Sequence, residues 1–187
     1  IISGDEITPY LVFMNSHDGT GAIKAAMTPV RVVCQNTLNL ALATAKRSWS
    51  TNHTGDIQGK LQDARNTLLY ADRYMGELGK AMDQLQQARL SDRKVYELID
   101  ALFPLIDGAT EQQKKNLLKL KEDVKLRYFE APDLKTVGKN GYRFINAVSD
   151  FATHGKPLRT RAGYRENLFA RTVDRNALID RAYQMLQ

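Results

Sequence analysis

Apolar residues in the middle of the chain repeat with a heptad period, in alternating steps of four and three residues. This spacing places the apolar side chains on one side of an α-helix, as a seam that needs a partner surface. At about 1.5 Å per residue, a helix over 57–89 is roughly 50 Å long, more than a compact domain of this size spans. The pattern predicts a long helix that projects or pairs along its length with another helix. Its apolar positions are Ile57, Leu61, Ala64, Leu68, Ala71, Met75, Leu78, Met82 and Leu85.

Two more helices are predicted to follow the long one. Ser91 begins the stretch "SDRKVYELIDALFP", in which Pro104 marks the stop. Thr110 and Gln113 have the spacing of a capping box and open the next helix. That helix offers a partner face for the long one, and we expect a helical hairpin or a three-helix arm over 56–130. The partner face consists of Leu117, Leu120 and Val124.

The N-terminal part predicts a small antiparallel sheet. The stretch "PYLVFMNS" is apolar and aromatic, and it ends at "HDGTG", where glycine accepts the backbone angles of a tight turn. Residues 9–16 and 20–27 are therefore expected to pair as a hairpin. The alternating stretch "SWSTNHT", residues 48–54, predicts a third and short strand.

Two interpretations fit the segment between these strands. Thr28 can cap a helix and Pro29 suits its first position, and apolar residues recur from there at helical steps. The alternative is that the second strand continues to residue 33 and the helix begins near Gln35, because the first residues are β-branched. The recurring positions are Val30, Val33, Cys34, Thr37, Leu38, Ala41, Leu42 and Ala45.

These elements predict an α+β fold that is mostly helical overall. A small antiparallel sheet has a backing helix that begins near Thr28, and a long helical hairpin or arm follows it. We expect three parts: an α+β core over 1–55, the heptad helix and helical arm over 56–130, and a basic helical C-terminal part over 131–187 that packs on the core.

Composition bears on the location of the chain. No apolar run approaches the roughly 20 residues of a membrane span, and the N-terminus lacks the basic-then-apolar order of a signal peptide. The single cysteine, Cys34, cannot form an internal disulfide, which agrees with a reducing compartment. We therefore expect a cytoplasmic protein. The chain opens without a methionine, so we also expect it to be a fragment of something longer.

Positive charge is concentrated near the C-terminus. Residues 139–187 contain nine Lys or Arg and four Asp or Glu, a net +5 out of the chain's formal +6. This asymmetry predicts an anionic partner for the C-terminal part, although an ordinary solvated basic surface has the same composition.

The stretch "GKPLRTRAGYRENLFAR" is the candidate binding segment. Arginine neutralises phosphates, and arginine and aromatic rings stack on bases, which is how proteins hold single strands without reading sequence. A basic loop that docks on an acidic protein has the same pattern. The predicted nucleic-acid-binding residues are Lys156, Arg159, Arg161, Tyr164, Arg165 and Arg171.

No set of residues predicts catalysis, a metal or a cofactor. His17 and Asp18 fit a hairpin turn, and neither His53 nor His154 has a second ligand at metal-binding spacing. Cys34 belongs to an apolar repeat, which predicts a buried structural thiol rather than a nucleophile. The glycines form no phosphate-binding loop. We therefore expect no catalytic residues and no enzyme activity.

Two stretches resemble a known family. Residues 14–56, including "NSHDGTGAIKAAMTPVRVVCQNTLNLAL", and residues around 140–154, "NGYRFINAVSDFATH", are similar to phage/plasmid-like proteins that carry a widespread domain of unknown function. The resemblance implies residence on mobile genetic elements or prophages. Members are longer upstream, which implies that this chain is the C-terminal portion. The resemblance supplies no activity and no catalytic residue.

Three functions remain open at this point. The first is a non-enzymatic protein that binds nucleic acid, such as single-stranded DNA in replication or recombination. A hairpin sheet followed by a helix is loosely similar to single-strand-annealing proteins, by fold analogy alone. The second is an interaction module that self-associates as a homo-oligomer through the helix 57–89. The third is a fragment of an enzyme whose active site lies in a missing N-terminal part.

Overall fold

A three-stranded antiparallel sheet and a group of helices make up the fold in a computed structural model of the chain. The structure describes residues 4–14, 22–33, 35, 37–40, 42, 48–52, 55–155 and 177–187. The strands are β1 (Ile7–Met14), β2 (Ile23–Arg31) and β3 (Ser48–Thr51), and β2 is the central one.

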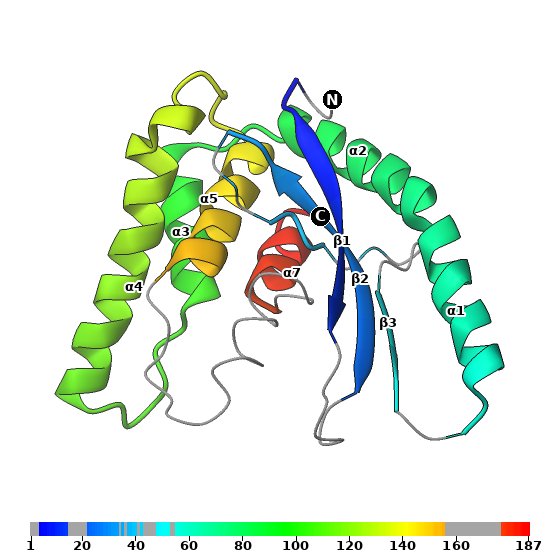
Figure 1. Cartoon of the computed structure of the whole chain (residues 1–187). Helices are drawn as coiled ribbons and strands as arrows, with labels where there is room; N and C mark the ends of the chain where they lie inside the picture. The colour runs from blue at the N-terminus through cyan, green and yellow to red at the C-terminus, as the bar shows by residue number, and fades with distance from the viewer. Residues whose placement is uncertain are drawn as a thin grey trace.

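Helices account for most of the described residues, so the predicted α+β class with a mostly helical chain is confirmed. In Figure 1 the sheet lies between the pair α1–α2 and the group of α3, α4, α5 and α7. The helices are α1 (Ile57–Leu69), α2 (Ala71–Gln87), α3 (Asp92–Leu102), α4 (Glu111–Glu130), α5 (Gly141–His154) and α7 (Ala177–Gln184), with a short 3-10 helix η1 (Pro132–Leu134) after α4.

The helix α5 is the centre of the core. Every residue from Gly141 to Ser149 is buried, so this helix has no solvent-facing side over its first half. The helices α2, α4 and α7 pack around it. Its first residue, Gly141, lies so close to α2 that a Cβ atom would be 3.0 Å from Leu85 and 3.1 Å from the Leu85 carbonyl oxygen.

The prediction of a helix beginning at Thr28 is wrong. Strand β2 continues through Thr28 and Pro29 to Arg31, and the described residues from 35 to 42 are not helical. The alternative of a longer strand is closer, although β2 ends two residues before the predicted residue 33. Thr37 then pairs with Val30 in an isolated antiparallel bridge.

Backbone pairing explains why Pro29 is tolerated inside a strand. The amide of Val32 donates to the Glu6 carbonyl oxygen at 2.9 Å, so the even-numbered residues of β1 carry the hydrogen bonds to β2. Pro29 lies opposite Pro9, at a position where neither residue donates to the other strand. The ladder therefore loses no bond at either proline.

The predicted hairpin is confirmed as an antiparallel pair, with bounds that differ from the prediction. Residues 7–14 pair with 23–31, rather than 9–16 with 20–27. The third strand is also present, over Ser48–Thr51, and it pairs with the first half of β2.

The heptad seam is buried along only half of its length. The predicted helix 57–89 is divided near Tyr70 into α1 and α2. In α2 the seam residues Leu78, Met82 and Leu85 are buried in the core. In α1, by contrast, Leu61 is 57% exposed.

The partner of the seam is α5 and not α4. Helix α4 packs mainly on α3 and α5. Of its three predicted contact residues, Val124 is buried, Leu117 is partly buried and Leu120 is exposed. The expectation that α4 covers the long helix is therefore wrong.

The helix start predicted at Ser91 and the capping box predicted at Thr110 are both confirmed. The Ser91 hydroxyl accepts a hydrogen bond from the Lys94 amide at 3.2 Å and caps α3. Thr110 and Gln113 form both bonds of a capping box at the start of α4, at 3.2 and 2.8 Å.

Candidate functional site

The predicted nucleic-acid-binding residues lie outside the described residues. Lys156, Arg159, Arg161, Tyr164, Arg165 and Arg171 all belong to the segment 156–176. The structure does show where that segment is attached. It follows α5, which ends at His154, and precedes α7, which begins at Ala177.

Both attachment points belong to the core. Helix α7 buries Ile179 and Ala182, and it packs against α5 and α3. At the end of α5, the Gly155 amide donates to the Phe151 carbonyl oxygen at 2.8 Å and closes the last turn. The segment 156–176 is therefore joined at both ends to helices that share one hydrophobic core.

Many cations of the described part have a carboxylate partner close by. Such exposed pairs contribute little to stability, but they reduce the positive potential of the surface. The pairs include Lys80 with Glu77, Arg93 with Glu97, Lys114 with Glu111, Lys121 with Asp100, Lys125 with Glu122 and Lys139 with Asp92.

Arg31 forms the most deeply buried ion-pair cluster in the described part. Its side chain is 2% exposed, and it donates to both oxygens of Asp5 at 2.9 and 3.1 Å. It also donates to the carboxylate of Asp133 and to the Asp133 carbonyl oxygen. The cluster joins the start of the chain, the end of β2 and η1.

Tyr142 of α5 completes this cluster. Its hydroxyl donates to the Asp5 carboxylate, and its own carbonyl oxygen accepts from the Asn146 amide group at 2.9 Å. Burial raises the pKa of the Tyr142 phenol well above its usual range, and the hydrogen bond to Asp5 and the negative charge of Asp5 raise it further. Because two carboxylates already pair with Arg31, this cluster fits a structural role that holds the three segments together better than it fits an anion-binding site.

Arg143 is the second buried arginine, and its side chain caps a helix. It donates to the carbonyl oxygens of Tyr128 at 2.7 Å, Val137 at 3.0 Å and Phe129 at 3.2 Å. Two of these oxygens belong to the last turn of α4, where backbone carbonyls have no partner within the helix. Arg143 is therefore used inside the fold, although the sequence counted it with the basic C-terminal residues.

The residues considered for catalysis do not form a reactive group in the part of the chain that the structure describes. His17, His53 and Cys34 lie outside the described residues. His154 lies 3.9 Å from an oxygen of Asp150 in the same helix. Among the described residues, no three His, Cys, Asp or Glu side chains are placed to hold a metal ion.

Asp150 is in turn paired with Arg127, which also bonds to Asp123 at 2.9 Å. Burial alone lowers the pKa of Arg127, but the hydrogen bonds and charges of Asp150 and Asp123 outweigh it and raise that pKa. The Arg127–Asp150 ion pair joins α4 to α5.

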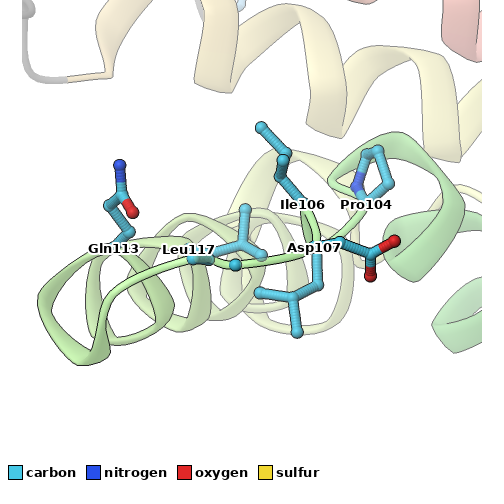
Figure 2. A pocket seen from close by; sticks show the side chains of 8 residues that line it. Pro104, Ile106, Asp107, Gln113 and Leu117 are labelled. Carbon is cyan, nitrogen blue, oxygen red and sulfur yellow. The ribbon is translucent and has the colours of Figure 1, made fainter.

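Two hollows open on the surface of the described part. One has a volume of about 300 Å³ and lies between the loop after α3 and the start of α4. Figure 2 shows its side chains, among them Ile106, Asp107 and Leu117. The other, of about 520 Å³, lies where α2 ends and where α3 and α5 begin, and Arg89 and Lys139 line it. In the second hollow, the Ser91 hydroxyl caps α3 and the Lys139 ammonium is paired with Asp92.

The described residues form an α+β fold with a helical core and a small sheet. The sequence matches the family described as Domain of unknown function (DUF932) over residues 1–182, and the chain belongs to that family. The match runs along nearly the whole chain and is not confined to the stretches 14–56 and 140–154 that carried the resemblance.

The other comparisons add no relative. No curated protein and no solved structure matches the chain. None of the helices in the described ranges is long and apolar enough to cross a membrane.

Proposed function

We propose that this chain is a non-enzymatic nucleic-acid-binding protein that holds single-stranded DNA through residues 156–171. The observation that carries the proposal is the distribution of net charge along the sequence. The segment 156–176 contains six Lys or Arg and two Asp or Glu, a net +4 out of the chain's formal +6. In the described part, by contrast, many cations lie beside carboxylates.

The attachment of the segment supports the same proposal. Its two ends join α5 and α7, which pack on each other in the core. A binding segment that is fixed at both ends loses less conformational freedom on binding than a free tail does. Arg159, Arg161 and Arg165 supply the phosphate contacts in this proposal, and Tyr164 stacks on a base.

The biological setting is part of the proposal. The resemblance to phage/plasmid-like proteins supports residence on a mobile genetic element and a role in replication or recombination. The single cysteine supports a cytoplasmic location. Replication or annealing genes beside the reading frame would agree with this setting, whereas genes for structural components would favour the interaction module.

The salt dependence of binding tests the proposal directly. If about five cations contact phosphate, log affinity for a fluorescent single strand should fall with log salt at a slope of roughly 3.5, since each contact contributes about 0.7. A fourfold increase in salt should therefore weaken binding on the order of a hundredfold. An anisotropy titration at about 50 mM salt that shows no association on the order of 10 µM would exclude the proposal.

Two variants separate phosphate contacts from stacking. Arg161→Ala should lower the slope by about 0.7 and weaken all sequences alike, because phosphate contacts carry no base information. Tyr164→Ala should cost about 1–3 kcal/mol of binding free energy with a nearly unchanged slope. Arg93→Ala is the matched control, since its side chain is 90% exposed and its loss changes the net charge equally. If Arg93→Ala weakens binding as much as Arg161→Ala does, binding depends on the net charge of the chain and not on a contact made by Arg161.

Self-association through the heptad helix remains the second candidate. Because α2 buries its seam residues in the core, this candidate is proposed for α1. Leu61 and Leu69 are exposed on α1. The variant Leu61→Lys, which places a charge on the exposed side of α1, tests this candidate.

A further inference from the structure

The outer edge of the sheet is exposed and apolar. Strand β1 is an edge strand, because β2 pairs with only one of its sides and no other described strand pairs with it. Three large residues of β1 face solvent to a large extent: Tyr10 is 53% exposed, Leu11 is 45% exposed and Phe13 is 63% exposed. An edge of this kind is a template for a further strand.

The backbone groups that face outward can be identified from the ladder. The bond from Val32 to the Glu6 carbonyl oxygen shows that even-numbered residues of β1 bond to β2. In an antiparallel ladder, the N–H and C=O groups of alternate residues point to opposite sides of the strand. The groups of Leu11 and Phe13 therefore point away from β2, while Pro9 has a carbonyl but no N–H on that side.

The chemistry of the strand favours an identical partner. Its sequence, ITPYLVFM, contains no charged residue, although exposed edge strands commonly carry charges that prevent pairing. Two copies of this strand therefore approach each other without repulsion. A strand with an apolar and uncharged edge is complementary to its own copy, which is the condition for a two-fold interface.

We propose that two copies of this chain associate by antiparallel pairing of β1 with the β1 strand of the second copy. The two-fold axis passes beside Val12, so that Leu11 lies opposite the partner subunit's Phe13. Both residues have outward-facing N–H and C=O groups, and the two equivalent pairs form four hydrogen bonds. This register leaves Pro9 outside the bonded positions.

The pairing extends the sheet and buries apolar side chains together. The three strands of each copy become one continuous sheet of six strands. Leu11 and Phe13 lie on the same face of β1, so each contacts an apolar residue of the other copy on that face. The inference does not rest on nucleic-acid binding, because no residue of 156–176 takes part.

Mass against concentration is the first test. Sedimentation equilibrium without nucleic acid, between about 1 and 200 µM, should show a shift from the mass of one chain, 21.1 kDa, towards that of two. The shift should persist at about 0.5 M salt, because no ion pair contributes to it. A mass of one chain at every concentration would overturn the proposal, whatever the outcome of the nucleic-acid titration.

Proline substitution tests the edge without disturbing the ladder to β2. Leu11→Pro removes an N–H that faces outward, and an edge strand tolerates proline there. Each dimer loses two hydrogen bonds, so association should weaken about tenfold or more while the circular dichroism and the melting temperature are kept. Undiminished association of Leu11→Pro would contradict the proposed edge.

A matched pair of charged variants distinguishes the two candidate surfaces. Leu11→Lys should weaken association strongly, because it replaces the apolar contact with the partner subunit's Phe13 by a charged side chain of the kind that blocks pairing at edge strands. Leu61→Lys, on the exposed side of α1, should associate as the unmodified chain does. The reverse result would assign the interface to the heptad helix instead.

The register makes a prediction for disulfide formation. Val12 faces the partner subunit's Val12 at a non-hydrogen-bonded position, where Cα atoms are about 4.5 Å apart, and a disulfide fits that distance. Val12→Cys should therefore form a cross-linked dimer under mild oxidation, and Tyr10→Cys should not. The unmodified chain, with Cys34 as its only cysteine, is the control. Cross-linking of Tyr10→Cys without that of Val12→Cys would exclude this register.

Discussion

At the scale of single residues, Arg31 shows which information is absent from a local sequence pattern. One of the two interpretations of the sequence placed it in the first turn of a helix, whereas the structure places it at the end of β2 between two carboxylates. Its partner Asp133 is 102 residues away in the chain. Spacing rules describe neighbours within a few residues, so they could not have found this cluster.

Two buried tyrosines are predicted to respond in opposite directions to the same substitution. The Tyr128 hydroxyl has no hydrogen-bond partner among the described residues, so Tyr128→Phe should leave stability unchanged or raise it by up to about 1 kcal/mol. The Tyr142 hydroxyl donates to Asp5, so Tyr142→Phe should cost about 1–3 kcal/mol. Urea unfolding of both variants measures the difference, and equal losses would contradict the assignment of these hydroxyls.

Both phenols also predict a loss of stability at alkaline pH. Burial raises the pKa of Tyr128 to about 12, and burial and Asp5 hold the pKa of Tyr142 well above its ordinary value. Because an unfolded tyrosine ionises near about pH 10, folding favours the protonated form. Their stabilising contribution is complete below about pH 10 and falls as the pH rises above it.

The double variant Tyr128→Phe with Tyr142→Phe isolates this effect. Its free energy of unfolding should fall less steeply above about pH 10 than that of the unmodified chain, since lysines titrate equally in both. Ultraviolet titration of the phenolates should also show late ionisation of two tyrosines in the folded chain. Parallel curves for the two proteins would show that these phenols ionise as freely in the fold as outside it.

At the scale of elements, local signals predicted helix starts well. Thr110 was recognised because an N-cap bonds to an amide three residues further on, so its evidence lies within one turn. The pair Thr28–Pro29 carries the same signal, but it lies in a strand. There the pairing with β1 decides the structure, and the sequence around Thr28 does not reveal that partner.

The heptad pattern shows the same limit at a larger scale. It predicted helix over nearly all of 57–89, but it could not indicate that α5 covers only the second half of the seam. For the candidate site, the sequence supplied the basic segment 156–171, which lies outside the described residues and stays a prediction.

The C-terminal end of α4 is predicted to depend on Arg143. Its guanidinium reaches three carbonyl oxygens in different directions, so Arg143→Met should cost about 2–4 kcal/mol by leaving buried acceptors without a partner. Arg143→Lys should restore little of this stability, because one ammonium group cannot donate to the three carbonyl oxygens in the geometry of the planar guanidinium. Hydrogen exchange should show faster opening of the last turn of α4 in both variants. Full protection of that turn in Arg143→Lys would contradict this role.

At the scale of the whole molecule, the division into three parts stays a prediction that unfolding can test. One buried apolar cluster includes Ile7 and Met27 of the sheet, Leu78 of α2 and Ile179 of α7. A shared core predicts cooperative unfolding, so Trp49 fluorescence from β3 and the circular dichroism of the helices should change at the same urea concentration. An earlier transition at Trp49 would show that the sheet opens as a separate unit.

The bonds of Arg31 also impose an order on events during synthesis. Asp5 leaves the ribosome before Arg31, whereas Asp133 follows 102 residues after it. At about 5–20 residues per second, Arg31 waits roughly 5–20 s for its second carboxylate. During that interval the newly made β1–β2 hairpin has no α5 to pack on. The edge of β1 is already complete in that interval, so the proposed pairing of two β1 strands could form between neighbouring nascent chains on one messenger RNA before either chain is finished.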